Sequence, residues 1–202
     1  MSWYDLFSKF YDSSLEPLYA EQRQLAANAL LLSADAVVLD VPCGTGLSFD
    51  AVAPKAGHVI AVDFSRGMLA KAAQRAKTKG FSNITGVQGD VTALTREQLP
   101  AKPITRLHVF LGLTAFPDWE RSFERLFDLL EPGGRCVVVD VYAETPTFQG
   151  RMVNLVARAD ITRKTWEPLQ RLSSDYARVD LPSRPDHGGQ LFLATGIKGA
   201  KS

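Results

Sequence analysis

The chain has 202 residues, which is enough for one domain with a sizeable core and too few for two ordinary domains. Lys and Arg total 23 against 22 Asp and Glu, so the net charge of +1 argues against a nucleic-acid partner, which needs a basic surface. Only two cysteines and no apolar run near the roughly 20 residues that span a bilayer exclude a disulfide framework and a membrane helix, and we expect a cytoplasmic protein.

Helix is the first predicted element. Residues 3–32 carry apolar side chains at three- and four-residue steps, and Pro17 is expected to divide this segment in two. Strands and helices then alternate along the chain. We predict buried strands at 37–41, 59–62, 84–87, 107–111 and 135–141, and helices at 47–56, 66–79 and 118–130. Residues 148–172 hold further helix, and two last strands are predicted at 175–181 and 190–197.

This alternation predicts the fold class. Buried strands separated by helices form parallel βαβ units, whereas the last two strands, with no helix between them, pair antiparallel as a hairpin. The prediction is an α/β, Rossmann-like, doubly wound and mainly parallel seven-stranded sheet with an antiparallel C-terminal hairpin. We expect residues 1–202 to form a single domain, with an N-terminal helical segment, a ligand-binding core, and a C-terminal helix and hairpin at 1–32, 35–142 and 143–202.

Acidic residues stand where the first three predicted strands end, and ligands of open α/β sheets bind beyond the carboxyl ends of the strands. Asp40 precedes a turn with glycines at 44 and 46, which let a backbone approach a ligand closely. Asp63 follows 19 residues after Gly44, where a carboxylate accepts both ribose hydroxyls. Asp90 follows the third strand and suits an adenine amine. Together these turns predict a crevice for adenosine.

The first turn separates two classes of adenosine cofactor. The dinucleotide fingerprint has a third glycine, where this chain has Phe49, and its pyrophosphate would be repelled by Asp40. A carboxylate at that position suits a ligand with a cationic amine and a sulfonium. An NAD(P)-dependent oxidoreductase is therefore the weaker alternative.

The order of these motifs resembles the class I S-adenosylmethionine-dependent methyltransferases over about residues 35–142. Asp40–Gly46 is similar to the first motif of that family, Asp63 to its ribose-binding acid, Asp90 and Val91 to its adenine-contacting pair, and Leu130–Arg135 to its L-x-P-G-G turn. Tyr4–Asp12 and Phe116–Trp119 are similar to the small quinone- and phospholipid-methylating branch.

The chain departs from the family pattern at two places. Pro42 replaces a commonly seen glycine in the first motif, and the fourth strand opens with Thr105 and Arg106 where the family usually has an acid. The sequence has no Asn/Asp-Pro-Pro-Tyr/Phe motif, which argues against methylation of DNA bases. A methyltransferase-like protein that binds S-adenosylmethionine without turnover therefore stays open as an alternative.

The resemblance implies an enzyme that uses S-adenosylmethionine and releases S-adenosylhomocysteine. The residues expected to bind the cofactor are Asp40, Val41, Pro42, Cys43, Gly44, Thr45, Gly46, Asp63, Phe64, Ser65, Met68, Asp90, Val91 and Leu111. Those expected to contact the methyl acceptor are Tyr4, Tyr11, Gly112, Thr114, Phe116 and Tyr142.

The acceptor is predicted to be a small hydrophobic or aromatic molecule. Residues 111–116, after the fourth strand, carry no charge, and an apolar wall disfavours a highly charged acceptor. Residues 1–32 are expected to form a lid over this pocket, and a helix that simply packs on the sheet is the alternative. No catalytic base is assigned, because His108 lies within an apolar strand and is predicted to be structural. The three histidines have no metal-ligand spacing, so no metal is expected.

Overall fold

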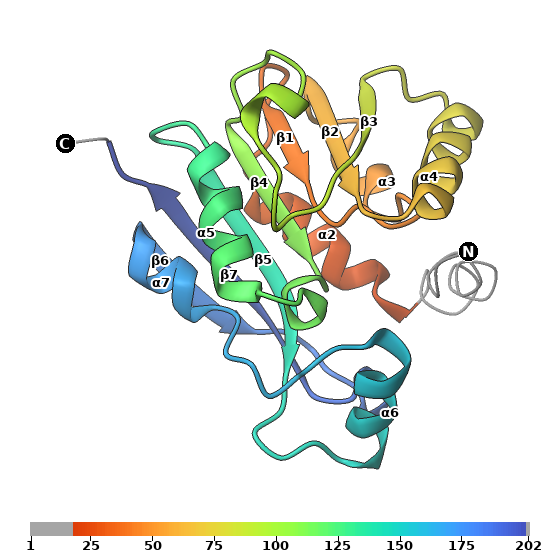
Figure 1. The fold of residues 1–202 in the computed structure, drawn as a ribbon, viewed down its shortest axis with the longest axis vertical. Helices are drawn as coiled ribbons and strands as arrows, with labels where there is room; N and C mark the ends of the chain where they lie inside the picture. The colour runs from red at the N-terminus through yellow and green to blue at the C-terminus, as the bar shows by residue number, and fades with distance from the viewer. Residues whose placement is uncertain (1–17, 201–202) are drawn as a thin grey trace.

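A computed structural model describes residues 18–200 of the chain as one sheet with helices on both of its faces (Figure 1). The sheet has seven strands in the order β3-β2-β1-β4-β5-β7-β6. The strands are β1 (Val37–Asp40), β2 (His58–Asp63), β3 (Ile84–Gln88), β4 (Arg106–Phe110), β5 (Arg135–Tyr142), β6 (Ser173–Asp180) and β7 (Gln190–Lys198). β1 to β5 pair parallel, and β7 pairs antiparallel with both β5 and β6. The predicted fold class and the C-terminal hairpin are confirmed.

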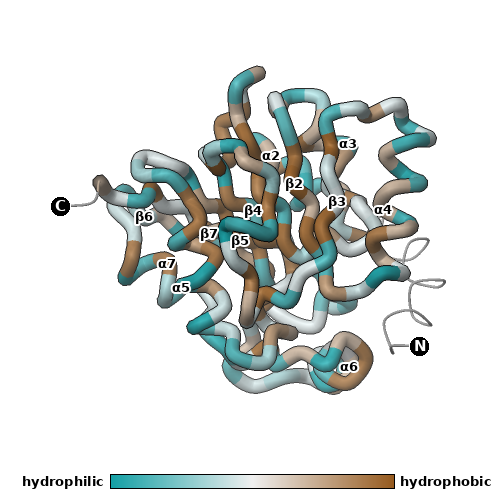
Figure 2. Tube along the Cα trace, turned by 45° about the horizontal axis from the view of Figure 1, so that its top comes forward, coloured by the Kyte–Doolittle hydropathy of each residue, from teal (hydrophilic) through white to brown (hydrophobic). Residues whose placement is uncertain are grey.

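The central strands are buried on both faces. Every residue of β1 is buried, and the Val-rich β5 is buried over all but its two end residues, as expected for parallel strands covered by helices. Apolar residues accordingly run along the central strands (Figure 2). One core lies between the sheet and α2 (Ala20–Ala29), α3 (Phe49–Val52) and α4 (Arg66–Lys79). The other lies between the sheet and α5 (Trp119–Leu129) and α7 (Glu167–Leu172).

Helix α4 begins and ends where its sequence signals predict. The Ser65 hydroxyl accepts a hydrogen bond from the Met68 amide at 3.2 Å, which caps the first turn. Gly80 ends the helix in the left-handed conformation with φ +74°. The N-terminus of α4 is thereby fixed directly after Asp63.

The prediction of a helix over residues 47–56 is wrong in its length, because α3 covers only four residues, Phe49–Val52. Pro54 has no amide to continue the helical ladder. The amides of Lys55 and Ala56 both bond to the Val52 carbonyl, so the chain turns instead.

The N-terminal prediction is tested only in part. Of the helix expected over residues 3–32, the structure describes α2, and residues 1–17 lie outside the described residues. The last carbonyls of α2 accept hydrogen bonds from two arginines that begin strands. Arg106 donates to Leu30 at 2.7 Å and Arg135 donates to Ala29 at 2.7 Å. Cations stabilise a helix C-terminus, so these strand starts hold α2 on the sheet.

The C-terminal third of the chain adds two helices before the hairpin. The helical material predicted over residues 148–172 is divided into α6 (Phe148–Ala157) and α7. α6 lies beyond the end of β5 (Figure 1). Within residues 18–200, no helix is both long and apolar enough to cross a membrane.

Candidate functional site

Asp63 joins the turns that follow β1 and β2. Its Oδ2 accepts a hydrogen bond from the Gly44 amide at 2.9 Å, and its Oδ1 accepts one from the Ser65 amide at 2.8 Å. Burial raises the pKa of Asp63, while these two amides act in the opposite direction. Each carboxylate oxygen has two acceptor positions, so both oxygens of Asp63 keep a position for a ligand.

The glycine turn after β1 has one open and one filled side. Gly44 has φ +54°, and a Cβ built there would meet no atom within 4 Å. Gly46 has φ +81°, and a Cβ there would lie 2.5 Å from Cε2 of the Phe49 ring. Phe49, at the position of the third dinucleotide glycine, is fully buried and packs against Gly46. The turn therefore has space for a ligand at Gly44, while Phe49 fills the helix side.

Pro42 joins the first turn to the turn after β4. A Cβ built on Gly112 would lie 2.3 Å from Cδ of Pro42, so only glycine fits beside this ring. The neighbouring Leu111 has φ +52°, a left-handed conformation that is unfavourable for a branched side chain. Its amide donates to the Val139 carbonyl at 2.8 Å, which anchors this turn on β5. Proline in place of the usual glycine thus serves packing between two strand ends.

Asp40 ends β1 and pairs with a histidine of β4. The Nδ1 atom of His108 lies 2.7 Å from Oδ1 of Asp40, and both side chains are buried. The two residues are direct neighbours in the β1–β4 register. His108, which the sequence predicted to be structural, thus contacts an expected cofactor residue.

The third turn lies beside the second and is more open. The Gly89 amide donates to the Asp63 carbonyl at 3.1 Å. Asp90 is exposed, and its Oδ1 accepts from both the amide and the hydroxyl of Thr92, at 2.9 and 2.7 Å. The structure therefore brings the expected cofactor residues to adjacent ends of β1, β2, β3 and β4. This group contains Asp40 to Gly46, Asp63 to Ser65, Asp90, Val91 and Leu111.

The residues expected to contact the methyl acceptor do not gather at one place. Tyr4 and Tyr11 lie outside the described residues. Thr114 is buried, and its hydroxyl donates to Asp140 at 3.0 Å instead of facing an acceptor. Phe116 is buried as well, and Tyr142 packs edge-on against Trp166. Of the residues expected to contact the methyl acceptor, Gly112 lies beside the turn that follows β1.

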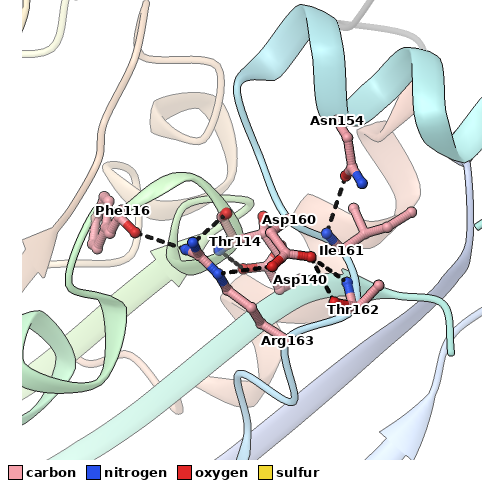
Figure 3. Close-up of polar contacts among 8 residues, drawn as sticks. All are labelled: Thr114, Phe116, Asp140, Asn154, Asp160, Ile161, Thr162 and Arg163. Atoms are coloured by element: carbon pink, nitrogen blue, oxygen red, sulfur yellow. Dashed lines mark hydrogen bonds and ion pairs between the residues drawn. The ribbon is translucent and has the colours of Figure 1, made fainter.

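A hydrogen-bond network that was not predicted from the sequence holds the segment after β4 (Figure 3). Asp140 on β5 is fully buried and accepts from the Thr114 amide at 3.1 Å as well as from its hydroxyl. Burial raises the pKa of Asp140 to about 6. Arg163 donates to the carbonyls of Thr114 and Phe116, at 3.2 and 2.7 Å. A lone acid inside the Val-rich β5 was the sequence signal for this network.

The thiol in the first turn is not suited to nucleophilic chemistry. Burial, followed by the charges of Asp40 and Asp63, raises the pKa of Cys43 well above its ordinary value. The cysteine therefore stays a neutral, packed residue.

Two surface hollows lie away from these turns. One of about 580 Å³ lies over residues 117–121, and one of about 380 Å³ lies between α4 and β2 and β3. Neither is lined by Asp40, Asp63 or Asp90. The convergence of strand-end acids on an open glycine turn, and not cavity size, identifies the candidate site.

Comparison with known proteins agrees with the motifs. Residues 38–134 match a family model described as a methyltransferase domain. A demethylmenaquinone methyltransferase of Lactococcus lactis is 36% identical over 107 residues, which are 51% of this chain and 41% of that protein. The chain spans about half the length of the curated relatives it matches.

Solved structures share the fold over most of the chain. The N-methyltransferase NodS from Bradyrhizobium japonicum, in complex with S-adenosylhomocysteine, has a TM-score of 0.71 at 17% identity and matches 91% of this chain and 89% of its own. The [4+2]-cyclase SpnF has a TM-score of 0.72 at 19% identity, over 90% and 82% of the two chains. The resemblance to class I S-adenosylmethionine-dependent methyltransferases, first drawn from the sequence motifs, is confirmed.

Proposed function

We propose that this chain, whose residues 38–134 match the methyltransferase domain family, binds S-adenosylmethionine and transfers its methyl group to a small acceptor. One observation supports this most directly: the space beside Gly44 is open, and the Gly44 amide donates to the carboxylate of Asp63 in the turn that follows Asp40. When bound, S-adenosylmethionine supplies a methyl group on a sulfonium, which is already a good leaving group.

The residues present fit that cofactor in charge and shape. Oδ2 of Asp40 is buried and has no hydrogen-bond partner within residues 18–200, which suits a cationic amine. Asp63 keeps acceptor positions for the ribose hydroxyls, and Asp90 keeps one oxygen for the adenine amine. The backbone at Gly44 allows a close approach without a Cβ.

The chain contributes positioning more than acid–base chemistry. Methyl transfer from a sulfonium is an in-line displacement, so orientation of the acceptor and exclusion of water supply much of the rate enhancement. The rigid turn at Leu111 and Gly112, held by Pro42 and by the Asp140 network, is the element we assign to acceptor positioning.

The acceptor we propose is hydrophobic or aromatic and resembles a quinone. The uncharged segment 111–116 supports this, as does the similarity to a demethylmenaquinone methyltransferase. Residues 1–32 complete the pocket as a lid in this proposal, and α2 already lies across the sheet with Tyr19 edge-on to Phe110. If the chain without residues 1–17 kept normal turnover, the proposal that residues 1–32 form a lid would be wrong.

A second candidate is a protein of this fold that binds S-adenosylmethionine without methyl transfer. The similarity in fold to SpnF, a [4+2]-cyclase, supports it only in showing that this fold also occurs in a protein named for another reaction. Release of S-adenosylhomocysteine with demethylated quinones and simple phenols as acceptors separates the two functions. Binding without release over that acceptor panel would favour the second candidate.

Calorimetry tests the cofactor directly. We expect S-adenosylhomocysteine to bind and NAD not to bind. Asp63→Ala should weaken binding of S-adenosylhomocysteine by about 1.5–3 kcal/mol, which is roughly 10- to 150-fold. Asp180→Ala, which removes an acid from the edge strand β6, is the matched control and should bind normally. Binding of NAD in place of S-adenosylhomocysteine would overturn the proposal.

A further inference from the structure

The pair of Asp40 and His108 lies on the α2 side of the sheet, next to the turn that follows β1. The 2.7 Å contact joins Nδ1 of His108 to Oδ1 of Asp40, and both side chains are at least 98% buried. An ionised carboxylate only accepts, so the imidazole carries a proton on Nδ1 in this contact. The pair is therefore a fixed donor–acceptor unit, set by the register of β1 against β4.

Each member of the pair keeps one buried polar atom without a protein partner. Within the described part of the chain, Oδ2 of Asp40 and Nε2 of His108 have no hydrogen bond. Buried polar atoms are nearly always paired, and an unpaired buried carboxylate oxygen is costly. The two residues therefore satisfy each other at Nδ1 and Oδ1, whereas Oδ2 of Asp40 still lacks a hydrogen-bond donor.

The surroundings of the pair contain few other charges. On the β5 side, His108 lies opposite Val137. On the α2 side, the Arg23 guanidinium lies 5.6 Å from the Phe110 ring, which in turn lies 5.9 Å from the His108 ring. His187 stacks on Tyr19 in the same core. At the strand ends the titratable neighbours of Asp40 are Asp63 and Cys43.

A cationic ligand beside Oδ2 completes this unit. An ammonium group donates the hydrogen bonds that the buried oxygen lacks, and its charge is opposite to that of a carboxylate.

We propose that His108 is a positioning residue that orients Asp40 toward the ammonium group of the cofactor. This inference rests on the proposed function. His108 is not a catalytic residue in this scheme, because its side chain is fully buried and reaches the ligand only through Asp40. Loss of the imidazole donor should weaken binding of the amino-acid end of the cofactor and leave binding of its adenosine unchanged.

Two ligands isolate this effect. S-adenosylhomocysteine carries the amino-acid end, whereas 5′-methylthioadenosine has the same adenosine and thioether without it. Both ligands bind through the same adenosine, so the ratio of the two affinities reports on the amino-acid end, where Asp40 lies in this proposal.

The experiment is calorimetry of both ligands with wild type, His108→Asn and His108→Leu at pH 7. His108→Asn keeps a donor near Nδ1, so its affinity ratio should be near that of wild type. His108→Leu removes the donor, and S-adenosylhomocysteine should bind about ten- to a hundredfold more weakly while methylthioadenosine binds normally.

The outcomes separate this inference from the proposed function. If wild type binds neither ligand, the proposed function itself is wrong. If wild type and His108→Leu bind the two ligands with the same affinity ratio, the role of His108 is refuted. Binding of methylthioadenosine also reports folding. If His108→Leu does not fold, His108→Gln, whose amide reaches the position of Nε2 instead of Nδ1, takes its place, and a wild-type ratio in that variant refutes the role as well.

Discussion

Removal of one buried hydroxyl at Thr114 should destabilise the chain in a pH-dependent manner. The Thr114 hydroxyl donates at 3.0 Å to Asp140, which is fully buried. A hydrogen bond to a charged group is worth about 1.5–3 kcal/mol, and the methyl group that Thr114→Val buries instead returns about 0.8 kcal/mol. We therefore expect a net loss of about 1–2 kcal/mol at pH 8, or a fall in Tm of roughly 2–8 °C.

The effect should shrink at lower pH. Burial raises the pKa of Asp140 from 3.8 to about 6, so near pH 5 the folded chain holds this carboxyl largely neutral. A bond to a neutral group is worth about 0.5–1.5 kcal/mol, which leaves a loss of under about 1 kcal/mol. Because the folded-state pKa is the higher one, the folded state binds more protons between about pH 4 and 6. Stability contributed by Asp140 is thus present below this window and is lost as pH rises through it, by on the order of 3 kcal/mol.

Thr162→Val is the matched control, since it removes the same kind of bond at the surface. The Thr162 hydroxyl donates to Asp160 at 2.6 Å in an exposed setting. Its loss should change stability by less than about 0.5 kcal/mol. Urea unfolding at pH 5 and pH 8 measures both variants. Equal losses for the two variants at pH 8, or a larger loss for Thr114→Val at pH 5, would refute the role of the Asp140 network.

Three further outcomes are expected at the candidate site. Gly112→Ala brings a Cβ to 2.3 Å from Pro42, so thermal unfolding should show a loss of about 1–3 kcal/mol in the free energy of unfolding. Gly86→Ala is the control, because its Cβ meets no atom closer than 3.8 Å and should be tolerated better. Asp90→Ala removes an exposed acceptor, and calorimetry should show S-adenosylhomocysteine bound roughly two- to tenfold more weakly; unchanged affinity would take Asp90 out of the site. Cys43 should resist iodoacetamide at pH 7.5 in the folded chain because burial raises its pKa, and rapid labelling would contradict this.

Much of the fold was predictable because its signals are local. Val37 to Asp40 is a run of apolar residues that ends in an acid, and Ser65 with Gly80 delimits a helix by capping alone. Parallel pairing then places the ends of β1 and β2 side by side, so Asp40 and Asp63 were expected to converge. Among the described helices, α3 was predicted too long, because Pro54 and the following turn override the helical pattern.

The parts that were missed depend on partners far apart in the chain. Asp140 and Thr114 are 26 residues apart, and Asp40 and His108 are 68 residues apart. No spacing rule in one sequence joins such residues, because their contact is set by sheet register and by the path of the loop after β4. A single acid in β5 and a single histidine in β4 were visible as exceptions to apolar strands. Their partners became evident only with the strand order.

The first residue of β4 is a departure from the family pattern, and its role decides whether that departure argues against methyl transfer. The strand begins with Arg106 where related enzymes usually have an acid, and its guanidinium binds the end of α2. Parallel strands carry the site at their carboxyl ends, so this substitution lies at the opposite end of the sheet. The site end of the same strand instead has His108 against Asp40 and a left-handed Leu111. The arginine therefore serves packing of α2, and its presence does not count against methyl transfer.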